Sequence, residues 1–228
     1  VNIGERTGTE PNYSYSGNAI IYGNVYGGSA EGTVNGTTAT SNTHTTQVNL
    51  YGGGVNGTIY GGGLGVAAVG EVGDPGYVAP IAANVFGAVT VTRNGGSAQD
   101  VFGCNNVNGA PQQTVVVTID GGTIGNVYGG GKDAPYPSTP TVAVSNGTVS
   151  NNVYGGGLGS TAITGGTDVT ISGGLGKNDV FGGGNLAGYQ PANASNKALV
   201  YVHNCVNTIK RVFGGGNAAA ASKVATII

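Results

Sequence analysis

The sequence predicts an all-β fold: a single-domain parallel β-helix (β-solenoid) of about seven to eight rungs, with a period of about 26 residues. Three observations predict it. A tag of Val or Ile, an aromatic residue and glycines recurs along the chain. Short apolar runs that alternate with polar residues precede the tags. Glycine supplies 47 of the 228 residues, which disfavours helices because each helical glycine costs about 1 kcal/mol relative to alanine.

The tag is best seen at Val127–Gly131, which reads Val-Tyr-Gly-Gly-Gly. The best-kept copies begin at Val101, Val127, Val153 and Val180 and lie 26, 26 and 27 residues apart. Other copies begin at Val25, Ile59, Val85 and Val212, and a partial copy begins at Leu50. A fixed period of this length indicates stacked units whose apolar faces are buried only by their neighbours.

The alternating runs lie about ten residues before the tags and predict half-buried strands. They are Val48–Leu50, Val89–Val91, Val115–Ile119, Val142–Val144, Val169–Ile171 and Val200–Val202. A glycine-containing turn usually follows each run, and a second short strand then leads into the tag. Strands that follow one another in the same direction with a uniform period close as a parallel β-helix, whereas a propeller blade needs about 40 residues or more.

The uninterrupted repeat predicts one domain, residues 1–228. Length differences between repeats fall in the connections after the tags, where solenoids tolerate insertions. The variable loops are expected at residues 29–45, 64–84, 132–140 and 185–197. The stretch from Leu64 to Pro80 is the longest departure from the repeat and is expected to protrude.

Stacked repeats place like residues in columns. Val or Ile is expected to stack on Val or Ile inside the molecule, and the aromatic residue of the tag is expected on the outer or corner side, over glycines. The converse assignment stays open. Another column stands immediately before the tags, where amide side chains on successive rungs hydrogen-bond to each other. Its members are Asn24, Asn84, Asp100, Asn126, Asn152 and Asp179, with Thr58 and Arg211 as interruptions.

Composition excludes several classes of function. Charged residues make up 8% of the chain, the net charge is −2, and Lys and Arg form no cluster, so no nucleic-acid partner is expected. No run of about 18 apolar residues predicts a membrane span. Methionine is missing even at position 1; we therefore expect that the start was removed by processing or excision, and no signal peptide can be read. Uncharged repeats rich in Gly, Thr and Asn favour an extracellular or cell-surface location.

The two cysteines, Cys104 and Cys205, lie four repeats apart. At about 4.8 Å per rung this separates them by roughly 19 Å, whereas a disulfide needs α-carbons within about 7 Å. We predict that they do not pair within one molecule. Two buried thiols and an intermolecular bridge are the alternatives.

No catalytic, cofactor-binding or metal-binding residue is predicted, and no enzyme activity. Asp120 and Asp168 could share a strand face two rungs apart and are the best candidates for a glycoside-cleaving pair, but no aromatic or basic cluster surrounds them in the sequence. His44 and His203 lie alone in different repeats. His203 shares a strand face with Cys205, yet no third ligand or orienting acid accompanies them.

The tag, with an Asn before it and a Gly-Gly turn upstream, resembles the Gly-rich β-solenoid repeats of large secreted or surface proteins of gut Bacteroidota. The resemblance covers nearly the whole chain. It implies an extracellular, adhesin-like or fibre-like structural protein, and no catalytic residue carries over from it.

Both ends of the chain support a more specific hypothesis. A solenoid exposes hydrogen-bonding edges at its first and last rungs, and Val1–Gly4 and Val224–Ile228 look like strands rather than caps. We therefore expect a structural or adhesive β-solenoid that joins end to end into a surface filament, with itself as partner and with glycans or a host surface as further partners. Two alternatives stay open: a fragment of a larger repeat adhesin, and a carbohydrate-binding or polysaccharide-cleaving β-helix with Asp120 and Asp168 in its groove.

Overall fold

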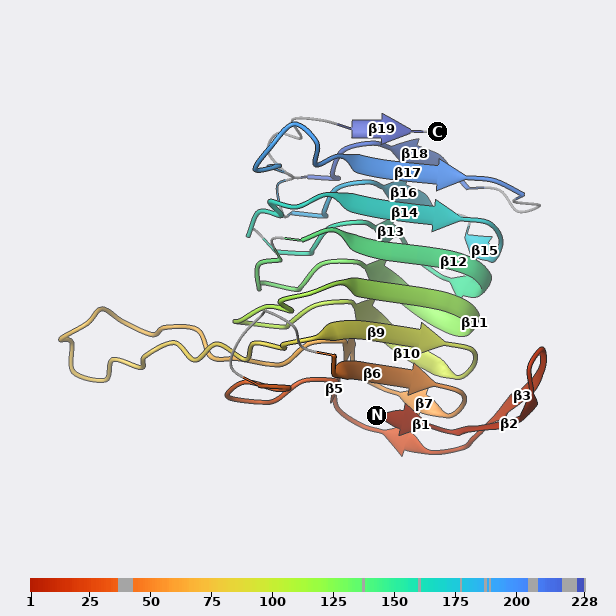
Figure 1. Ribbon diagram of the computed structural model, residues 1–228, viewed down its shortest axis with the longest axis horizontal. Coiled ribbons are helices and arrows are strands. Elements are labelled where there is room, and N and C mark those ends of the chain that lie inside the picture. The colour runs from red at the N-terminus through yellow and green to blue at the C-terminus, as the bar shows by residue number, and fades with distance from the viewer. Residues whose placement is uncertain are drawn as a thin grey trace.

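The computed structural model of the chain describes residues 1–36, 43–136, 138–159, 161–176, 178–186, 188, 190–204, 209–218 and 225–227. Over these residues the protein contains strands, turns and connecting segments, and no helix. One large sheet, whose strands pair in parallel, curls around a narrow interior, and a two-stranded hairpin stands beside it (Figure 1). This all-β architecture is compatible with the predicted solenoid.

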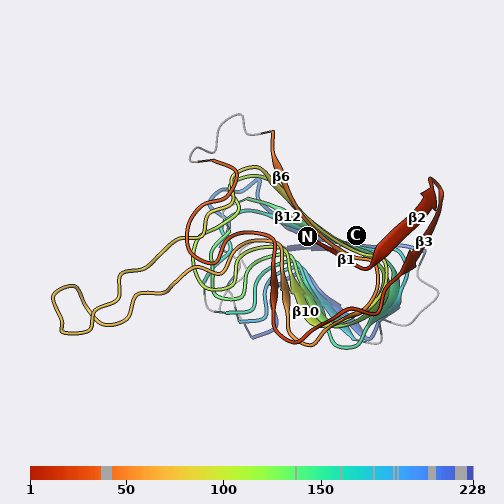
Figure 2. The same cartoon turned by 90° about the horizontal axis from the view of Figure 1, so that it is seen from below.

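Three rows of strands form the curled sheet, and Figure 2 shows the rows end-on. The first row contains β1 (Asn2–Ile3), β6 (Thr45–Leu50), β9 (Ala88–Arg93), the first parts of β11 (Val115–Tyr128) and β12 (Pro140–Val149), β14 (Thr167–Ile171), β17 (Ala198–Val202) and β19 (Ala225–Ile227). The middle row contains β4 (Ile20–Ile21), β7 (Gly54–Val55), the first part of β10 (Ser97–Phe102), the following parts of β11 and β12, and β15 (Leu175–Gly176). The tag row contains β5 (Val25–Tyr26), β8 (Ile59–Tyr60), the last parts of β10 and β11, β13 (Val153–Tyr154), β16 (Asp179–Phe181) and β18 (Arg211–Phe213).

Tags pair with tags in the tag row. Val127 lies beside Val101 on one side and Val153 on the other. The first row keeps the same register, since Val117 lies beside Val91 and Val142. The predicted alignment of these tags is confirmed, because residues about one period apart in the sequence are neighbours in the sheet.

The copy of the tag at Val85 does not belong to this row. The row passes directly from Ile59 to Val101, and Val85 forms isolated bridges with Val34 and Pro111 instead. Counting Val85 as a further member of the tag column is therefore wrong. Its segment stacks as part of the connections on another side of the molecule.

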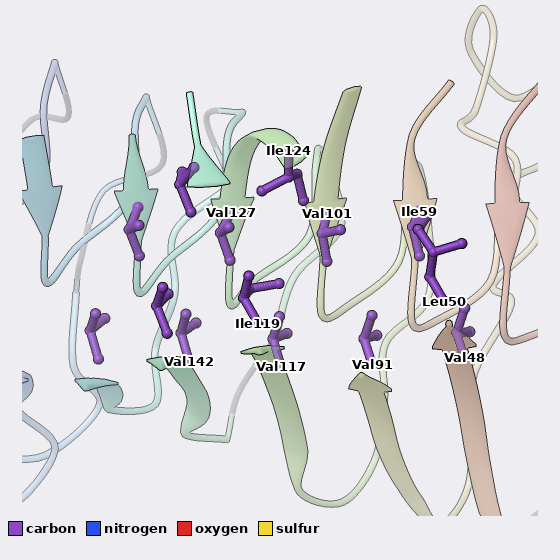
Figure 3. Close-up of a cluster of buried hydrophobic side chains, with 14 of the residues drawn as sticks. Val48, Leu50, Ile59, Val91, Val101, Val117, Ile119, Ile124, Val127 and Val142 are labelled. Atoms are coloured by element: carbon purple, nitrogen blue, oxygen red, sulfur yellow. The ribbon is translucent and has the colours of Figure 1, made fainter. Parts of the chain in front are cut away.

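The interior of the sheet is aliphatic, because side chains alternate between the core and the surface along each strand. The tag residue Val127 is fully buried in this core, so the predicted inward direction of the tag valine is confirmed. Val127 and Val101 face the first-row residue Val117 across the interior (Figure 3). Burial of one such side chain contributes about 1.5–3 kcal/mol. The first-row column contains Val48, Val91, Val117, Val142, Val169 and Val200, all buried.

One interior position carries a cation. Arg93 lies in register with Leu50 and Ile119, and its side chain is fully buried. Its guanidinium donates hydrogen bonds to the carbonyl oxygens of Gly121 at 3.2 Å and Thr123 at 2.7 Å, and to Gly96. The expectation of Val or Ile throughout the interior columns is wrong here, because turn carbonyls give this cation polar partners.

The first glycine of the tag has a steric explanation. A Cβ atom added to Gly103 would lie 2.5 Å from the carbonyl oxygen of Gly129 in the next repeat. Gly129 meets the carbonyl oxygen of Gly155 in the same way. A Cβ at any of these positions would force neighbouring strands apart, so the close stacking requires glycine.

The connections after the tags begin as further stacked backbone. Lys132 N–H donates to the carbonyl of Asn105 at 3.0 Å, and Asn185 N–H donates to that of Gly157 at 2.8 Å. The region expected to hold the longest loop forms an arm, Val66–Ile81, which projects at a right angle to the stacking direction (Figure 1). Regular stacking therefore extends a few residues into the segments predicted as variable loops.

A hairpin not predicted from the sequence interrupts the first repeat. Strands β2 (Glu5–Thr9) and β3 (Asn12–Ser16) pair in antiparallel fashion and extend away from the curled sheet (Figure 2). Tyr15 stacks on Tyr51 of the main body with ring centroids 5.6 Å apart. This contact attaches the hairpin to the end of β6.

Cys104 is a free thiol, fully buried among Val85, Val89, Val115 and Tyr136. Its Sγ lies 3.4 Å from the carbonyl oxygen of Gly129. Cys205 lies outside the described residues.

Candidate functional site

The aromatic residues of the tags form one continuous stack. Its seven rings, in order, are Tyr26, Tyr60, Phe102, Tyr128, Tyr154, Phe181 and Phe213. Neighbouring centroids lie 4.3–5.2 Å apart, and each such pair adds about 0.5–1.5 kcal/mol beyond the burial of its surface. The five inner rings are buried. The rings lie on the side of the sheet opposite to the tag valines, as predicted, but the five inner rings are buried rather than exposed at the surface.

Burial changes the acidity of the stacked phenols. Desolvation raises the pKa of Tyr60 and Tyr128 above the ordinary value of 10.0, and the pKa of Tyr154 is raised for the same reason. These groups are neutral in the folded protein at any physiological pH. The hydroxyls of Tyr60, Tyr128 and Tyr154 therefore do not act as acids near neutral pH, and the three rings contribute through packing.

Part of the predicted Asn/Asp column is present next to the stack, but its side-chain oxygens accept mainly from backbone N–H groups rather than from other amide side chains. Asn126 N–H donates to Asp100 Oδ1 at 2.7 Å, and Asn152 N–H donates to Asn126 Oδ1 at 3.1 Å. Asp179 N–H continues the series to Asn152 Oδ1 at 3.0 Å. The backbone amides of Asn126, Asn152 and Asp179 are therefore each bound by the side chain of the preceding repeat.

Two predicted members of the column behave differently. Asn84 is outside the column, and its Oδ1 accepts a hydrogen bond from Ala110 N–H at 3.0 Å. Thr58 does not interrupt the series at its own level, because its N–H donates to Asn24 Oδ1 at 2.9 Å. The backbone donor is available from any residue except proline, so this level needs only the oxygen of Asn24.

The column ends in an ion pair. Arg211 Nε lies 3.0 Å from Asp179 Oδ1, and its Nη2 lies 2.6 Å from Oδ2. This is the one ion pair in the part of the chain that the structure describes. The Asp179 side chain is 12% exposed and that of Arg211 is 58% exposed. The guanidinium hydrogen bonds hold the pKa of Asp179 below its ordinary value of 3.8.

The first edge of the curled sheet is formed by β1, β4 and β5, each of which pairs with described strands on one side (Figure 1). Apolar side chains are exposed here: Ile20 is 58% exposed and Tyr22 is 84% exposed. A strand edge with unpaired backbone groups is a template for pairing with another strand. This edge is the first half of the candidate site.

The last edge is formed in the tag row by β18, which pairs with β16 alone among the described strands, and in the first row by β19, which lies one level further on β17. Phe213, the last ring of the aromatic stack, is 36% exposed, whereas Phe181 beneath it is buried. The last edge therefore presents the same Val-aromatic-Gly sequence that the first edge presents at Val25–Gly27. Such self-similar edges are the arrangement that head-to-tail association of identical chains requires.

The candidate glycoside-cleaving acids are not brought together. Asp168 pairs with Thr141, and Thr141 pairs with Val116. Asp168 therefore lies two strands away from β11, at the level of a residue four positions before Asp120. Strand geometry then separates the two backbones by about 16 Å, beyond the roughly 5–9.5 Å between carboxyl groups that glycosidases use. Asp120 instead accepts a hydrogen bond from Ser145 Oγ at 2.8 Å.

The histidines also stay apart. His203 lies 4.7 Å from the Tyr201 ring and 3.1 Å, through Nδ1, from Asn204 Nδ2, while His44 is exposed in the second repeat. Within the residues that the structure describes, no three His, Cys, Asp or Glu side chains gather as metal ligands. Its described segments likewise contain no helix able to cross a membrane.

No protein-family model, no curated protein and no solved structure matches this chain.

Proposed function

We propose that this chain is an extracellular structural or adhesive β-solenoid, a parallel β-helix of about seven to eight rungs, that assembles end to end into a filament. The observation that carries the proposal is that both ends of the tag row present the same Val-aromatic-Gly sequence. Val212 and Phe213 end the tag row on one side, and Val25 and Tyr26 end it on the other. A second copy whose β5 stacks on β18, with its β1 in the place that β19 takes on β17, would repeat a tag contact that the chain already makes six times.

Backbone hydrogen bonds support a head-to-tail joint, in which the last edge of one copy meets the first edge of the next. In every internal level the first glycine of a tag donates to the carbonyl of the aromatic residue in the next repeat; Gly129 N–H to Tyr154 O is 2.9 Å, and Gly182 N–H to Phe213 O is 2.8 Å. If this pattern continues by one level across the joint, Gly214 N–H would donate to the carbonyl oxygen of Tyr26 in the next copy. Donors at the last edge thus meet acceptors at the first edge, and the contact leaves the far edges free for further copies.

Burial of exposed rings supports the same contact. Phe213 would gain a stacking partner in Tyr26 of the next copy, and both rings would be covered as the five inner rings are. A head-to-tail contact without closing rotation produces an open filament rather than a ring. The low proportion of charged residues, 8%, removes much of the repulsion between copies.

Electron microscopy and sedimentation of the 228-residue chain over a range of concentrations test the proposal. We expect unbranched filaments one molecule wide above a critical concentration. Phe213→Glu places a charge in the joint and should abolish them, whereas Val72→Glu, at the tip of the arm, should not. Dispersed short rods at every concentration would defeat the proposal.

A fragment of a larger repeat adhesin is the first alternative. In that case repeats of the same polypeptide would occupy the positions that β5 and β18 leave open here. The edges would be the same, and the isolated 228-residue chain would still be expected to associate through them. Filaments of the native, full-length protein distinguish the two: their subunit spacing would then exceed that of the 228-residue chain.

Carbohydrate binding is the second alternative, and one surface feature favours it. A shallow polar depression beside Asp168 is lined by Thr139, Gly166, Ser195 and Lys197. Carboxylate, hydroxyl and ammonium groups in one depression suit the hydroxyls of a sugar chain. Affinity electrophoresis in polysaccharide gels, with Asp168→Asn against the unchanged chain, would show retardation that the substitution removes.

A further inference from the structure

The β2–β3 hairpin carries an aromatic cluster that lies outside the buried core. Arg6 pairs with Tyr15, and Gly8 pairs with Tyr13, across the two strands. Side chains alternate between the two faces of a strand, so Arg6, Tyr13 and Tyr15 share one face of the hairpin. Tyr51, directly after β6, packs against this face through its ring contact with Tyr15.

The guanidinium of Arg6 lies among these rings. Its Cζ is 4.6 Å from the centroid of the Tyr13 ring and 5.6 Å from that of the Tyr51 ring. Gly8, opposite Tyr13, has no side chain, so Arg6 can reach the Tyr13 ring diagonally across the hairpin. The rings restrict the guanidinium to few orientations, and it would therefore lose little further freedom on binding a ligand.

The hydrogen-bond donors of Arg6 are not matched by an acid. A cation–π contact leaves the five N–H donors of a guanidinium without oxygen acceptors. Within the described residues no carboxylate forms an ion pair with Arg6. Arg6 is exposed, and Tyr13, Tyr15 and Tyr51 are half-buried. The cluster thus presents a positioned cation and partly open phenol rings to solvent.

We propose that this cluster binds an acidic saccharide, with the carboxylate of a sugar acid on Arg6 and the sugar ring against the tyrosines. A guanidinium matches a carboxylate through two parallel hydrogen bonds. Tyrosine offers an apolar ring and a hydroxyl, which suit the C–H groups and the hydroxyls of a sugar. The inference does not depend on end-to-end assembly, because a single chain contains all four side chains.

The size of the hairpin face favours a saccharide over a protein partner. Strands β2 and β3 contain five residues each, so the face is about 17 Å long and roughly 10 Å wide. Its area, on the order of 200 Å², is about a quarter of what each partner contributes to a stable protein–protein interface. A short stretch of a sugar chain fits this area. In a filament the cluster would recur once per molecule, so weak single contacts would combine by avidity.

Binding of the dispersed chain to immobilised polygalacturonate, a polymer of a sugar acid, tests the proposal by surface plasmon resonance. We expect binding to this polymer and none to its methyl-esterified form, whose carboxylates are blocked. Arg6→Gln should weaken binding roughly tenfold or more, the effect of losing charge-assisted hydrogen bonds. Arg6→Lys keeps the charge without the planar fork and should give a smaller loss. Tyr13→Leu, which removes a ring that positions the guanidinium, should weaken binding roughly threefold.

Lys132→Gln is the matched control, because it removes an exposed cation outside the hairpin. Its binding should stay within about twofold of that of the unchanged chain. The hairpin contains no buried side chain, so the unfolding midpoints of all variants should equal that of the unchanged chain. Where Arg6→Gln lowers this midpoint, the comparison of Arg6→Lys with Lys132→Gln decides instead.

Several outcomes would overturn the proposal. Absence of binding to polygalacturonate, or equal binding by the unchanged chain and Arg6→Gln, would refute the site and leave end-to-end assembly untouched. Equal weakening in Arg6→Gln and Lys132→Gln would show general attraction to a polyanion. Undiminished binding of the esterified polymer would refute the carboxylate contact. Equally tight binding of polyglutamate, lost in Arg6→Gln, would assign the cluster to an acidic peptide instead of a saccharide.

Discussion

Phe102 and Tyr128 lie one above the other, with ring centroids 4.3 Å apart and ring planes 2° from parallel. They are 26 residues apart in the sequence and occupy the same position in neighbouring repeats. This contact brings together the period of the sequence, the register of the sheet and the burial of the largest apolar side chains. Substitutions in the stack should therefore be costly to the stability of the fold.

Tyr128→Ala should lower the free energy of unfolding by about 3–5 kcal/mol, because it leaves a cavity between two buried rings. Tyr128→Phe keeps both ring contacts and should cost about 1 kcal/mol or less. Urea denaturation of the dispersed chain measures both. Tyr22→Ala is the matched control, since Tyr22 is 84% exposed; an equal loss there would contradict the stacking account.

Gly129→Ala should destabilise the protein by about 2–3 kcal/mol through overpacking. The added methyl group meets the carbonyl oxygen of Gly155 and lies 3.0 Å from Val142 Cγ2. Gly23→Ala is the control, because a Cβ there meets nothing within 4 Å, and its effect should be about 0.5 kcal/mol or less. Similar unfolding midpoints for the two variants would show that neighbouring repeats are not in the close contact described.

Substitutions at Arg93 test whether the buried cation is needed for the stability of the fold. Burial lowers the pKa of Arg93 to about 10, and its hydrogen-bond partners are all carbonyls. Arg93→Met, which restores an aliphatic column with Leu50 and Ile119, should leave stability unchanged or raise it by about 1–2 kcal/mol. Arg93→Ala leaves a cavity and should cost about 3 kcal/mol. Equal losses in both variants would show that the guanidinium hydrogen bonds stabilise the fold.

Stability should fall in alkaline solution. Burial raises the pKa of Tyr60, Tyr128 and Tyr136 above 10.0, so the folded state favours their neutral form. Their contribution is fully present below the unfolded value of about 10 and is lost as pH rises above it, because the unfolded chain ionises first. Urea midpoints between about pH 9 and pH 11.5 should decrease, with tyrosinate absorbance of these groups rising only on unfolding. Complete ionisation with a native circular dichroism spectrum would contradict this burial.

The sequence predicted the parallel register well, because its strongest signal is also its main packing force. Val101, Val127 and Val153 occur at a fixed period, and a one-residue slip in any strand would turn these valines out of the core. The Asn/Asp column was predictable for the same reason. Asn126 and Asn152 stand directly before the valines whose positions are already fixed.

Elsewhere the sequence misled or gave no signal. Arg93 follows an alternating strand and resembles a surface residue; its burial depends on turn carbonyls from two repeats, which no single-residue pattern reveals. Val85 resembles a tag, but it bridges Val34 and Pro111 instead of another tag, and Gly87 turns the chain with a φ of 94°. The β2–β3 hairpin contains no buried side chain, and without a hydrophobic face it lacks the signal by which strands are predicted.

Helical reconstruction of filaments by cryo-electron microscopy tests the central claim most directly. Seven described tags share one row. A joint in which β5 of the next copy stacks on β18, and β1 of that copy takes the place of β19 on β17, predicts an axial rise of about 34 Å per molecule, with density repeating every 4.8 Å or so across the joints. The tag aromatic residues should then form one unbroken column through successive molecules. Filaments whose copies meet side by side, or whose aromatic columns are offset at each joint, would contradict the account.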